Sequence, residues 1–284
     1  MSSPEIIDLN DLLSPVSEEN PAGSDIRKDS SPTSNYYLIK DARNSARAAE
    51  RNSLFDGGSD EANENWRKII DLAPKILRED AKDLEIASWY TEALIRRYGF
   101  QGLRDGFTLI SGLIEHFWEH LHPEPDEDGI ETRVASLTGL NGEGAEGVLI
   151  PPIRNTPITQ DLEPGPFTIW QYRQAMDAQK VSDEELRDKK IAQMGFSVAD
   201  IEQTVANSSD DFYINLRDDL NQSIEEYRKV RDMLDTHCGV HDAPPTSNII
   251  NALEDTLSTV RHLAKLKLPE ENSAEPTDDE SSDN

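Results

Sequence analysis

The sequence predicts an all-α fold: a multi-helix bundle that closes with an antiparallel helical hairpin at its C-terminal end. Apolar residues recur at steps of three and four over most of the chain, which is typical of buried helix faces. Residues that cap helices precede several of these stretches, and glycine or proline follows them. No stretch requires an ordered strand. An irregular N-terminal arm and a disordered acidic tail complete the prediction.

Composition restricts the class of protein. The 284 residues carry 28 Lys and Arg against 56 Asp and Glu, so the net charge is −28. This charge repels phosphate backbones and excludes nucleic acid as an expected partner. No apolar run approaches the roughly 18 residues of a spanning helix, so no membrane insertion is expected. The acidic start is unlike a secretory signal, and a single cysteine, Cys238, fits a reducing compartment. These features predict a cytoplasmic protein.

Three regions are expected along the chain. Residues 1–32 form the irregular arm, because they are rich in Ser, Pro, Asp and Asn, although a few leucines and a valine are available for docking. Residues 33–268 form the helical domain, with a candidate subdomain break in the proline-rich segment 151–166. Residues 269–284 hold seven acids, no base and no large apolar side chain, so we expect this tail to be disordered.

The helical domain begins with helices over about 35–51 and 63–78, separated by a Gly-Gly loop. Trp66 belongs to the apolar side of the second helix. Proline in a helix interior removes a hydrogen bond and clashes with the preceding turn. Pro74 therefore predicts a kink in the second helix or a split into two pieces.

A longer helical stretch follows. Asp80 or Asp83 can cap a helix over 84–98, because a short carboxylate accepts hydrogen bonds from the free amides of a first turn. Gly99 fits the left-handed position after its end. Apolar residues over 103–121 then recur at alternating steps of four and three, the most periodic pattern in the chain. This pattern predicts a buried helix seam.

Shorter elements occupy the next part of the chain. A helix is expected over about 130–140, followed by an extended crossing segment over 147–166, which contains five prolines. Helices resume over 167–177. Two capping-box signatures then each predict a short helix: Ser182 with Glu185, and Ser197 with Asp200.

The last two helices are expected over about 209–236 and 246–267. Each carries an apolar stripe, and a short Gly/Pro break separates them. Two matched stripes joined by a short break predict an antiparallel helical hairpin.

One motif suggests a catalytic site. His116, Glu119 and His120 have the H-x-x-E-H spacing of inverted zinc proteases. Both imidazoles would share a helix face and bind zinc, and Glu119 would activate water. No downstream residue is singled out as a further ligand, and the spacing arises easily by chance. A zinc-dependent hydrolase is therefore the alternative of another class.

Other candidate sites are weaker. His237, Cys238 and His241 lie in a predicted interhelical turn without paired ligand spacing, so an ordinary turn is favoured over a metal site. The glycines at 141–147 lack the Lys-Ser/Thr end of a phosphate-binding loop. The four tryptophans all fall in predicted helices, which favours core packing over ligand stacking. No cofactor is expected.

Several short motifs occur in a fixed order along the first half of the chain. They are carried by Pro21, Gly23, Asp25, Trp66, Asp83, Leu84, Trp118, Leu121, His122, Pro123 and Arg133. In this order they resemble the N-terminal domain family of ImpA/TssA, components of the bacterial type VI secretion system. The resemblance continues more weakly into the last helices and covers about residues 10–267.

The resemblance implies architectural roles for these residues. Trp118 and Leu121 would anchor a helix end that Pro123 terminates. Arg133 would tie the acidic loop at 122–129 by charge-assisted hydrogen bonds. His116 has no part in the motif, so the resemblance removes support for the zinc site.

The resemblance also implies a cytoplasmic, non-enzymatic assembly protein that contacts baseplate, sheath and tube proteins and supports contractile-tail assembly. An accessory role at the distal sheath end is the alternative within the same machine. Longer family members continue into a ring-forming part, so we expect either a short relative or a portion of one, and self-association stays open. The acidic exterior predicts salt-sensitive association with basic patches.

Overall fold

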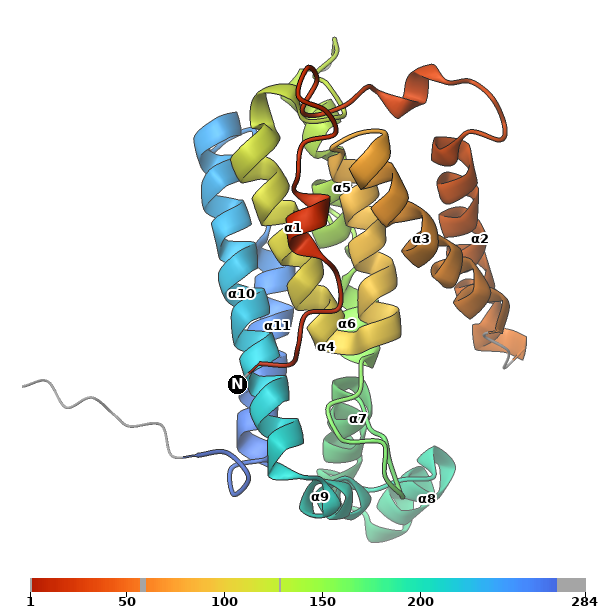
Figure 1. The fold of residues 1–284 in the computed structure, drawn as a ribbon. Coiled ribbons are helices and arrows are strands. Elements are labelled where there is room, and N and C mark those ends of the chain that lie inside the picture. Colours follow the sequence, from red (N-terminus) through yellow and green to blue (C-terminus); the bar gives the residue numbers. More distant parts are fainter. Residues whose placement is uncertain (1, 57–59, 128, 270–284) are drawn as a thin grey trace, which may run out of the picture.

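The computed structural model describes residues 2–56, 60–127 and 129–269, and over these ranges the chain folds into helices with no ordered strand (Figure 1). The predicted all-α class is confirmed. The tail predicted beyond residue 269 lies outside the described residues. None of the described helices combines the length and the apolar composition needed to cross a membrane.

The N-terminal arm is more ordered than predicted. It contains a one-turn helix, α1 (Leu9–Leu12), and a 3-10 turn at Ile26–Lys28. Figure 1 shows it running along the outside of the bundle, where α1 contacts α3 and α4. Leu12 and Ile7 are buried. The prediction of an irregular arm is therefore only partly right, because contacts with distant helices order what the local sequence does not.

A buried polar clamp holds the start of the arm. The guanidinium of Arg104 donates to the carboxylate of Asp219 at 2.6 Å and to the carbonyl oxygen of Ser3 at 2.6 Å. Asp219 also accepts from the amide of Ser3 at 3.1 Å, and Asp105 accepts from the amide of Ile6 at 2.6 Å. The three charged side chains of the clamp are at most 5% exposed. Their mutual pairing makes this burial of charge tolerable.

Helices α2 (Asn35–Asp56) and α3 (Asp60–Glu79) form a pair that packs through α3 onto the rest of the bundle (Figure 1). Of the two outcomes predicted at Pro74, the split is wrong, because α3 continues through that residue as one helix. Ala73 and Ile76 on either side of the proline are fully buried. Both halves of α3 are thus held against the same core, which keeps the helix in one piece.

Helix α4 (Leu84–Phe117) is the centre of the fold and packs against α3, α5 and α10. The two helices predicted here are joined across a kink at Gly99, whose φ of 61° lies in the left-handed region that the sequence suggested. The seam predicted to reach residue 121 stops earlier as an α-helix. It continues as a 3-10 turn over Trp118–His120.

Helix α5 (Ile130–Asn141) is followed by α6 (Ile150–Asn155), a helix that the sequence did not predict. The expectation of an extended segment over 147–166 is wrong at this point. Pro151 and Pro152 occupy the first turn of α6. A first turn has no partner for its amide hydrogens, so proline starts a helix there instead of breaking it.

Helices α7 (Ile169–Gln179), α8 (Glu184–Met194) and α9 (Val198–Asn207) form the lower end of the molecule in Figure 1. The capping box predicted for Ser197 and Asp200 is confirmed at the start of α9.

The capping box predicted for Ser182 and Glu185 is wrong. Asp183 caps α8 instead, and its carboxylate accepts from the amide of Leu186 at 3.0 Å. Aspartate is as good an N-cap as serine, so spacing alone could not choose between the two neighbours.

Helices α10 (Asp210–Cys238) and α11 (Ser247–Leu263) form the predicted closing hairpin. Helix α10 packs along α4, where the rings of Phe107 and Tyr227 lie 4.5 Å apart. His237 and Cys238 belong to the last turn of α10 and do not lie in the turn predicted for them.

The clamp gives the first testable prediction. Arg104→Ala leaves two buried carboxylates without their cation, so we expect a loss of about 3–5 kcal/mol in the free energy of unfolding. The amides of Ser3 and Ile6 should also exchange faster with deuterium. The matched control is Arg228→Ala, which removes an exposed pair with Glu254 and should cost less than about 1 kcal/mol. Equal losses for the two variants would show that the clamp contributes nothing special.

Candidate functional site

Most of the motif residues singled out by the sequence meet at one end of the bundle. We call residues 21–25, 80–84 and 118–123 the motif junction. The amide of Lys82 donates to the carbonyl of residue 22 at 2.8 Å, and its carbonyl accepts from the amide of His122 at 3.0 Å. These two bonds join three segments that are separated by about 40 to 60 residues of sequence, so the junction exists only in the folded chain.

The arm enters the junction through a tight turn. Gly23 has a φ of 73°, in the region that glycine adopts without strain. A Cβ atom at this position would lie 2.1 Å from the carbonyl oxygen of Asp80. That oxygen accepts from the amide of Ser24 at 3.0 Å, and the carbonyl of Pro21 accepts from the amide of Val16 at 2.9 Å. Glycine is therefore needed for both conformation and space.

A carboxylate and an arginine link the arm to the start of α4. Asp83 caps α4 by accepting from the amides of Glu85 and Ile86 at 2.9 and 3.1 Å. Arg27 donates to Asp83 at 2.7 Å, to Glu85 at 2.7 Å and to Asp25 at 3.1 Å. Burial alone would raise the pKa of Asp25, but the bonds from Arg27 hold it below its ordinary value.

Arg27 lies just after the arm segment of the junction and bonds to two of its carboxylates, Asp25 and Asp83, and sequence reasoning missed it. Its position two residues after Asp25 was the available signal, because the motif aspartate needs a cation when it is drawn into the fold. Burial lowers the pKa of Arg27, whereas the charges of Asp83 and Glu85 raise it, and the net direction is upward. The guanidinium therefore stays charged and ties two carboxylates of α4 to the arm.

Lys82 is buried completely at the centre of the junction. Its ammonium group donates to the carbonyl oxygens of Leu12 and Leu77, both at 2.7 Å, and lies 5.6 Å from the ring centre of Phe117. No carboxylate in the described residues is paired with it. Burial consequently lowers its pKa to about 8.

The segment after α4 closes the junction from the other side. Leu84 and Leu121 are fully buried, and His122 is 4% exposed. The amide of Leu84 donates to the carbonyl of His122 at 2.8 Å, and Nε2 of His122 lies 3.4 Å from the carbonyl oxygen of Gly23. The imidazole of His122 thus packs in the interior, against the turn of the arm at Gly23.

One turn of the junction faces outward. Arg133 donates to the carbonyl oxygens of Trp118 and Pro123 at 2.7 and 3.1 Å, and its guanidinium lies 5.1 Å from the ring centre of Trp118. This half-buried indole also stacks on His237 of α10, with the ring centres 4.4 Å apart. Arg133 therefore holds the described part of the acidic loop through backbone carbonyls, and the carboxylate of Asp126 in that loop accepts from the hydroxyl of Thr132. Glu119 beside Trp118 is exposed.

Trp66 lies outside the junction. Its ring nitrogen donates to Glu50 at 2.7 Å, and the guanidinium of Arg96 lies 4.1 Å from its ring centre. Arg96 also pairs with Glu50 at 2.5 Å. This cluster joins α2, α3 and α4, so Trp66 has a packing position of its own. Among the tryptophans, Trp170 departs from the predicted core packing and is 50% exposed.

The zinc site is not supported. His116 lies in the last turn of α4, whereas Glu119 and His120 lie in the following 3-10 turn, so the three do not share one α-helix face. Within the ranges that the structure describes, no group of three His, Cys, Asp or Glu side chains is placed to hold a metal. The same finding applies to His237, Cys238 and His241.

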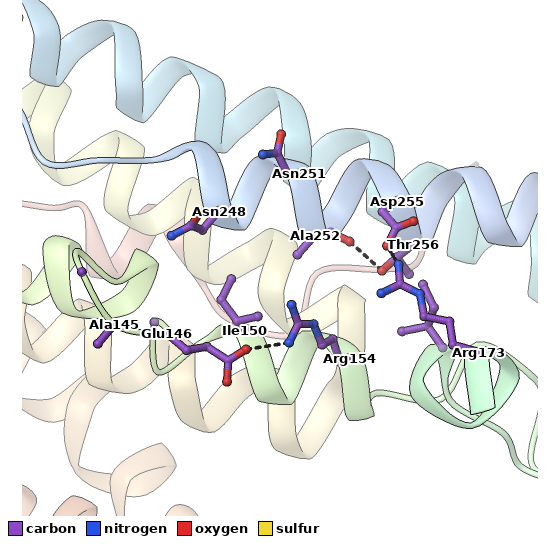
Figure 2. Close-up of a pocket in the computed structure, with 13 residues that line it drawn as sticks. Ala145, Glu146, Ile150, Arg154, Arg173, Asn248, Asn251, Ala252, Asp255 and Thr256 are labelled. Carbon is purple, nitrogen blue, oxygen red and sulfur yellow. Dashed lines mark hydrogen bonds and ion pairs between the residues drawn. The ribbon is translucent and has the colours of Figure 1, made fainter. Parts of the chain in front are cut away.

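A groove of about 680 Å³ lies at the other side of the bundle, between α11 and the α6 and α7 helices (Figure 2). Figure 2 shows Arg154 pointing to Glu146, at 2.6 Å, and Arg173 pointing to Asp255, with which it forms an ion pair. Cations and anions thus cancel inside the groove. The sequence did not reveal it, because its walls come from separate segments.

Comparisons with known proteins agree with this architecture. Residues 13–142 match the family described as ImpA, N-terminal, type VI secretion system. The type VI secretion system component TssA1 of Pseudomonas aeruginosa is 24% identical over 190 residues, which cover 66% of this chain and 52% of that protein. The chain thus spans about half the length of this curated relative.

A solved structure shows the same fold over nearly the whole chain. It is the N-terminal domain, including the conserved ImpA_N region, of the TssA component from Burkholderia cenocepacia. The TM-score is 0.75 at 26% identity, and the match covers 92% of this chain and 94% of that one.

By its fold and by the family match, the chain is similar to the all-helical N-terminal module of type VI secretion system components. The matched region, residues 13–142, is similar to the ImpA N-terminal family, in agreement with the resemblance that the ordered motifs suggested.

Gly23 provides a test of the junction. Gly23→Ala should lower the free energy of unfolding by at least about 2 kcal/mol, because both the left-handed backbone and the close carbonyl of Asp80 oppose a methyl group. Gly144→Ala is the matched control. Gly144 also has a positive φ but has no atom near its missing Cβ, so about 1 kcal/mol is expected. Urea unfolding measures both, and a loss at Gly23 no larger than at Gly144 would contradict the close approach.

Lys82 gives a prediction for pH. Its folded pKa of about 8 lies below the ordinary 10.5, so between these values the unfolded chain holds a proton that the folded chain has released. The contribution of Lys82 to stability should therefore rise with pH over this window, by up to about 3 kcal/mol, and stay constant below it. Urea unfolding of the natural chain and of Lys82→Met, each measured between about pH 7.5 and about pH 10.5, isolates this contribution. Parallel curves for the two proteins would show that Lys82 titrates as an ordinary lysine.

Proposed function

We propose that this chain is a non-enzymatic assembly module of the type VI secretion system, which docks to baseplate, sheath and tube proteins in the cytoplasm and supports contractile-tail assembly. The observation that carries the proposal is the motif junction. Family-motif residues from three distant segments converge there on a single rigid structure. Nearly all of their side chains serve internal contacts, and this is what a docking body requires.

The outward turn of the junction is the proposed docking surface, which we define as Trp118, Glu119, His120 and His237. Arg133 and His237 both contact the indole of Trp118, so this half-buried aromatic ring has little conformational freedom to lose on binding. Glu119 and His120 are exposed beside it. Rigid aromatic side chains flanked by charges are favoured at the centres of protein interfaces.

A binding role is supported over catalysis by the way the junction uses its titratable groups. Asp25, Asp83 and Lys82 all have their polar atoms engaged by the backbone or by Arg27. None of them is free to exchange a proton with a bound substrate, which general acid–base chemistry requires. The two TssA proteins that this chain resembles are both described as components of the type VI secretion system.

The charge of the chain indicates the kind of partner surface. A net charge of −28 favours basic patches on the partners and accelerates their encounter. Because such attraction acts between exposed charges, salt should weaken it.

The docking surface is tested by binding to each purified baseplate, sheath and tube protein of the cognate system. Trp118→Ala should weaken binding to at least one of them by about tenfold or more, because it removes the aromatic centre of the surface. Biolayer interferometry at about 50 and 500 mM salt measures affinity, and the natural chain should bind more weakly at the higher salt.

His116→Ala is the matched control, because His116 is exposed nearby but lies outside the proposed surface. It should bind like the natural chain, and thermal unfolding should show that both variants are folded. Absence of binding to every cognate protein, or equal binding of Trp118→Ala and the natural chain, would contradict the proposal.

A second role in the same machine is an accessory that acts at the distal end of the sheath. The resemblance that motivates the first role motivates this one equally. Fluorescent localisation through an extension and contraction cycle separates them, because an assembly module stays at the baseplate when the sheath extends, whereas an accessory moves with its far end.

A further inference from the structure

Helix α8 is held as a helix without being buried. None of its residues is buried in the fold. Its ends are fixed instead: Asp183 caps the first turn, and the amide of Gly195, in the left-handed conformation, donates to the carbonyl of Ile191 at 3.0 Å. An isolated helix of eleven residues is marginal in water. Caps at both ends and partial contact with α7 therefore maintain a helix whose outer face is free.

The outer face has a defined composition. Arg187, Ile191 and Met194 are half-buried and lie on one side of α8. The opposite side carries Glu185, Leu186, Lys189, Ala192 and Gln193, all of them exposed. Leu186 is 47% exposed. The outer face thus combines an apolar centre with one acid and one base four residues apart.

The two charged residues of this face, Glu185 and Lys189, form no ion pair within the described part of the chain. Arg187 pairs with Glu184 and Asp188 along the helix, but neither Glu185 nor Lys189 is in an ion pair anywhere in the described ranges. Glutamate four residues before lysine is a spacing that can pair along a helix. Here the two side chains remain available to another molecule.

The charge of this region differs from that of the rest of the chain. Residues 180–195 contain four Lys or Arg and four Asp or Glu, so they are neutral within a chain of net charge −28. Two copies of the chain repel each other over most of their surfaces. They do not repel each other where α8 meets α8.

We propose that the outer face of α8 is a self-association surface, on which the α8 helix of a second copy of this chain packs antiparallel across a two-fold axis. In this arrangement Glu185 of each copy lies opposite Lys189 of the other, so both charge pairs form at once. A two-fold axis always presents the same patch to itself, so the patch must be self-complementary. The acid and the base on this face satisfy that condition only in the antiparallel orientation.

The size of the surface sets the strength of the association. One short helix per copy buries much less than the roughly 1,600 Å² of a standard interface. The dimer should therefore form only at protein concentrations above roughly 100 μM for the isolated chain, and be promoted where other contacts hold copies together. The proposal does not depend on the docking function, because α8 and the motif junction occupy different ends of the fold.

A charge-exchange experiment tests the arrangement by sedimentation velocity between about 10 μM and 1 mM at about 0.15 M salt. The natural chain should show a rise in weight-average mass with concentration. Glu185→Lys alone and Lys189→Glu alone should each remain monomeric, because each places like charges opposite each other. An equimolar mixture of the two variants should regain association at least to the level of the natural chain.

Leu186→Ser tests the apolar centre and should reduce self-association about tenfold or more. Leu38→Ser is its matched control, because Leu38 on α2 is 43% exposed but distant in the fold, and it should associate like the natural chain. A natural chain that stays monomeric at every concentration would overturn the proposal. Association that persists in both single charge variants, or a mixture that does not recover, would equally overturn it.

Discussion

The hydrogen bonds of Lys82 are the interaction on which the rest of the structure depends. Its amide, carbonyl and ammonium groups bond to the arm, to the segment after α4 and to the end of α3. A single residue thereby fixes the relative positions of these three segments. Its side chain is buried with backbone carbonyls as its partners, and not with a carboxylate. Carbonyl oxygens can satisfy the three donors of an ammonium group, but they return only part of the hydration energy lost on burial, and the lowered pKa follows from that difference.

Arginines repeat this use of basic side chains in the interior. Arg27 joins the arm to α4, Arg104 joins it to α10, and Arg133 holds the turn at Trp118. Arg104 and Arg133 are each 5% exposed. A chain with twice as many acids as bases thus places several of its few bases inside, where they hold loops and the arm together. Asp83, Glu92, Asp105 and Asp219 are buried as well, so the buried bases are matched by buried acids and the net acidity of the chain remains on its outer surface.

The sequence predicted most members of the candidate site but not their arrangement in space. The sequence named Gly23, Asp83 and His122 as members of one motif set, but not as neighbours, because their spacing carries no information about which loops meet. Arg27 escaped notice because its importance comes from Asp83, more than fifty residues away. The H-x-x-E-H spacing pointed to a metal site only on the assumption of a continuous helix, and the helix ends at Phe117, before the motif does.

The sequence by itself determined the all-α class, most helix positions, the closing hairpin, the positive φ at Gly99 and the family resemblance. These depend on periodicity, capping and ordered motifs, which are local properties that each segment carries alone. Tertiary structure decided the rest. It kept α3 in one piece through Pro74, made a helix start of Pro151 and Pro152, ordered the arm, and left α8 capped but uncovered. In each case the outcome depends on contacts or burial contributed by distant parts of the chain, and no window of neighbouring residues contains that information.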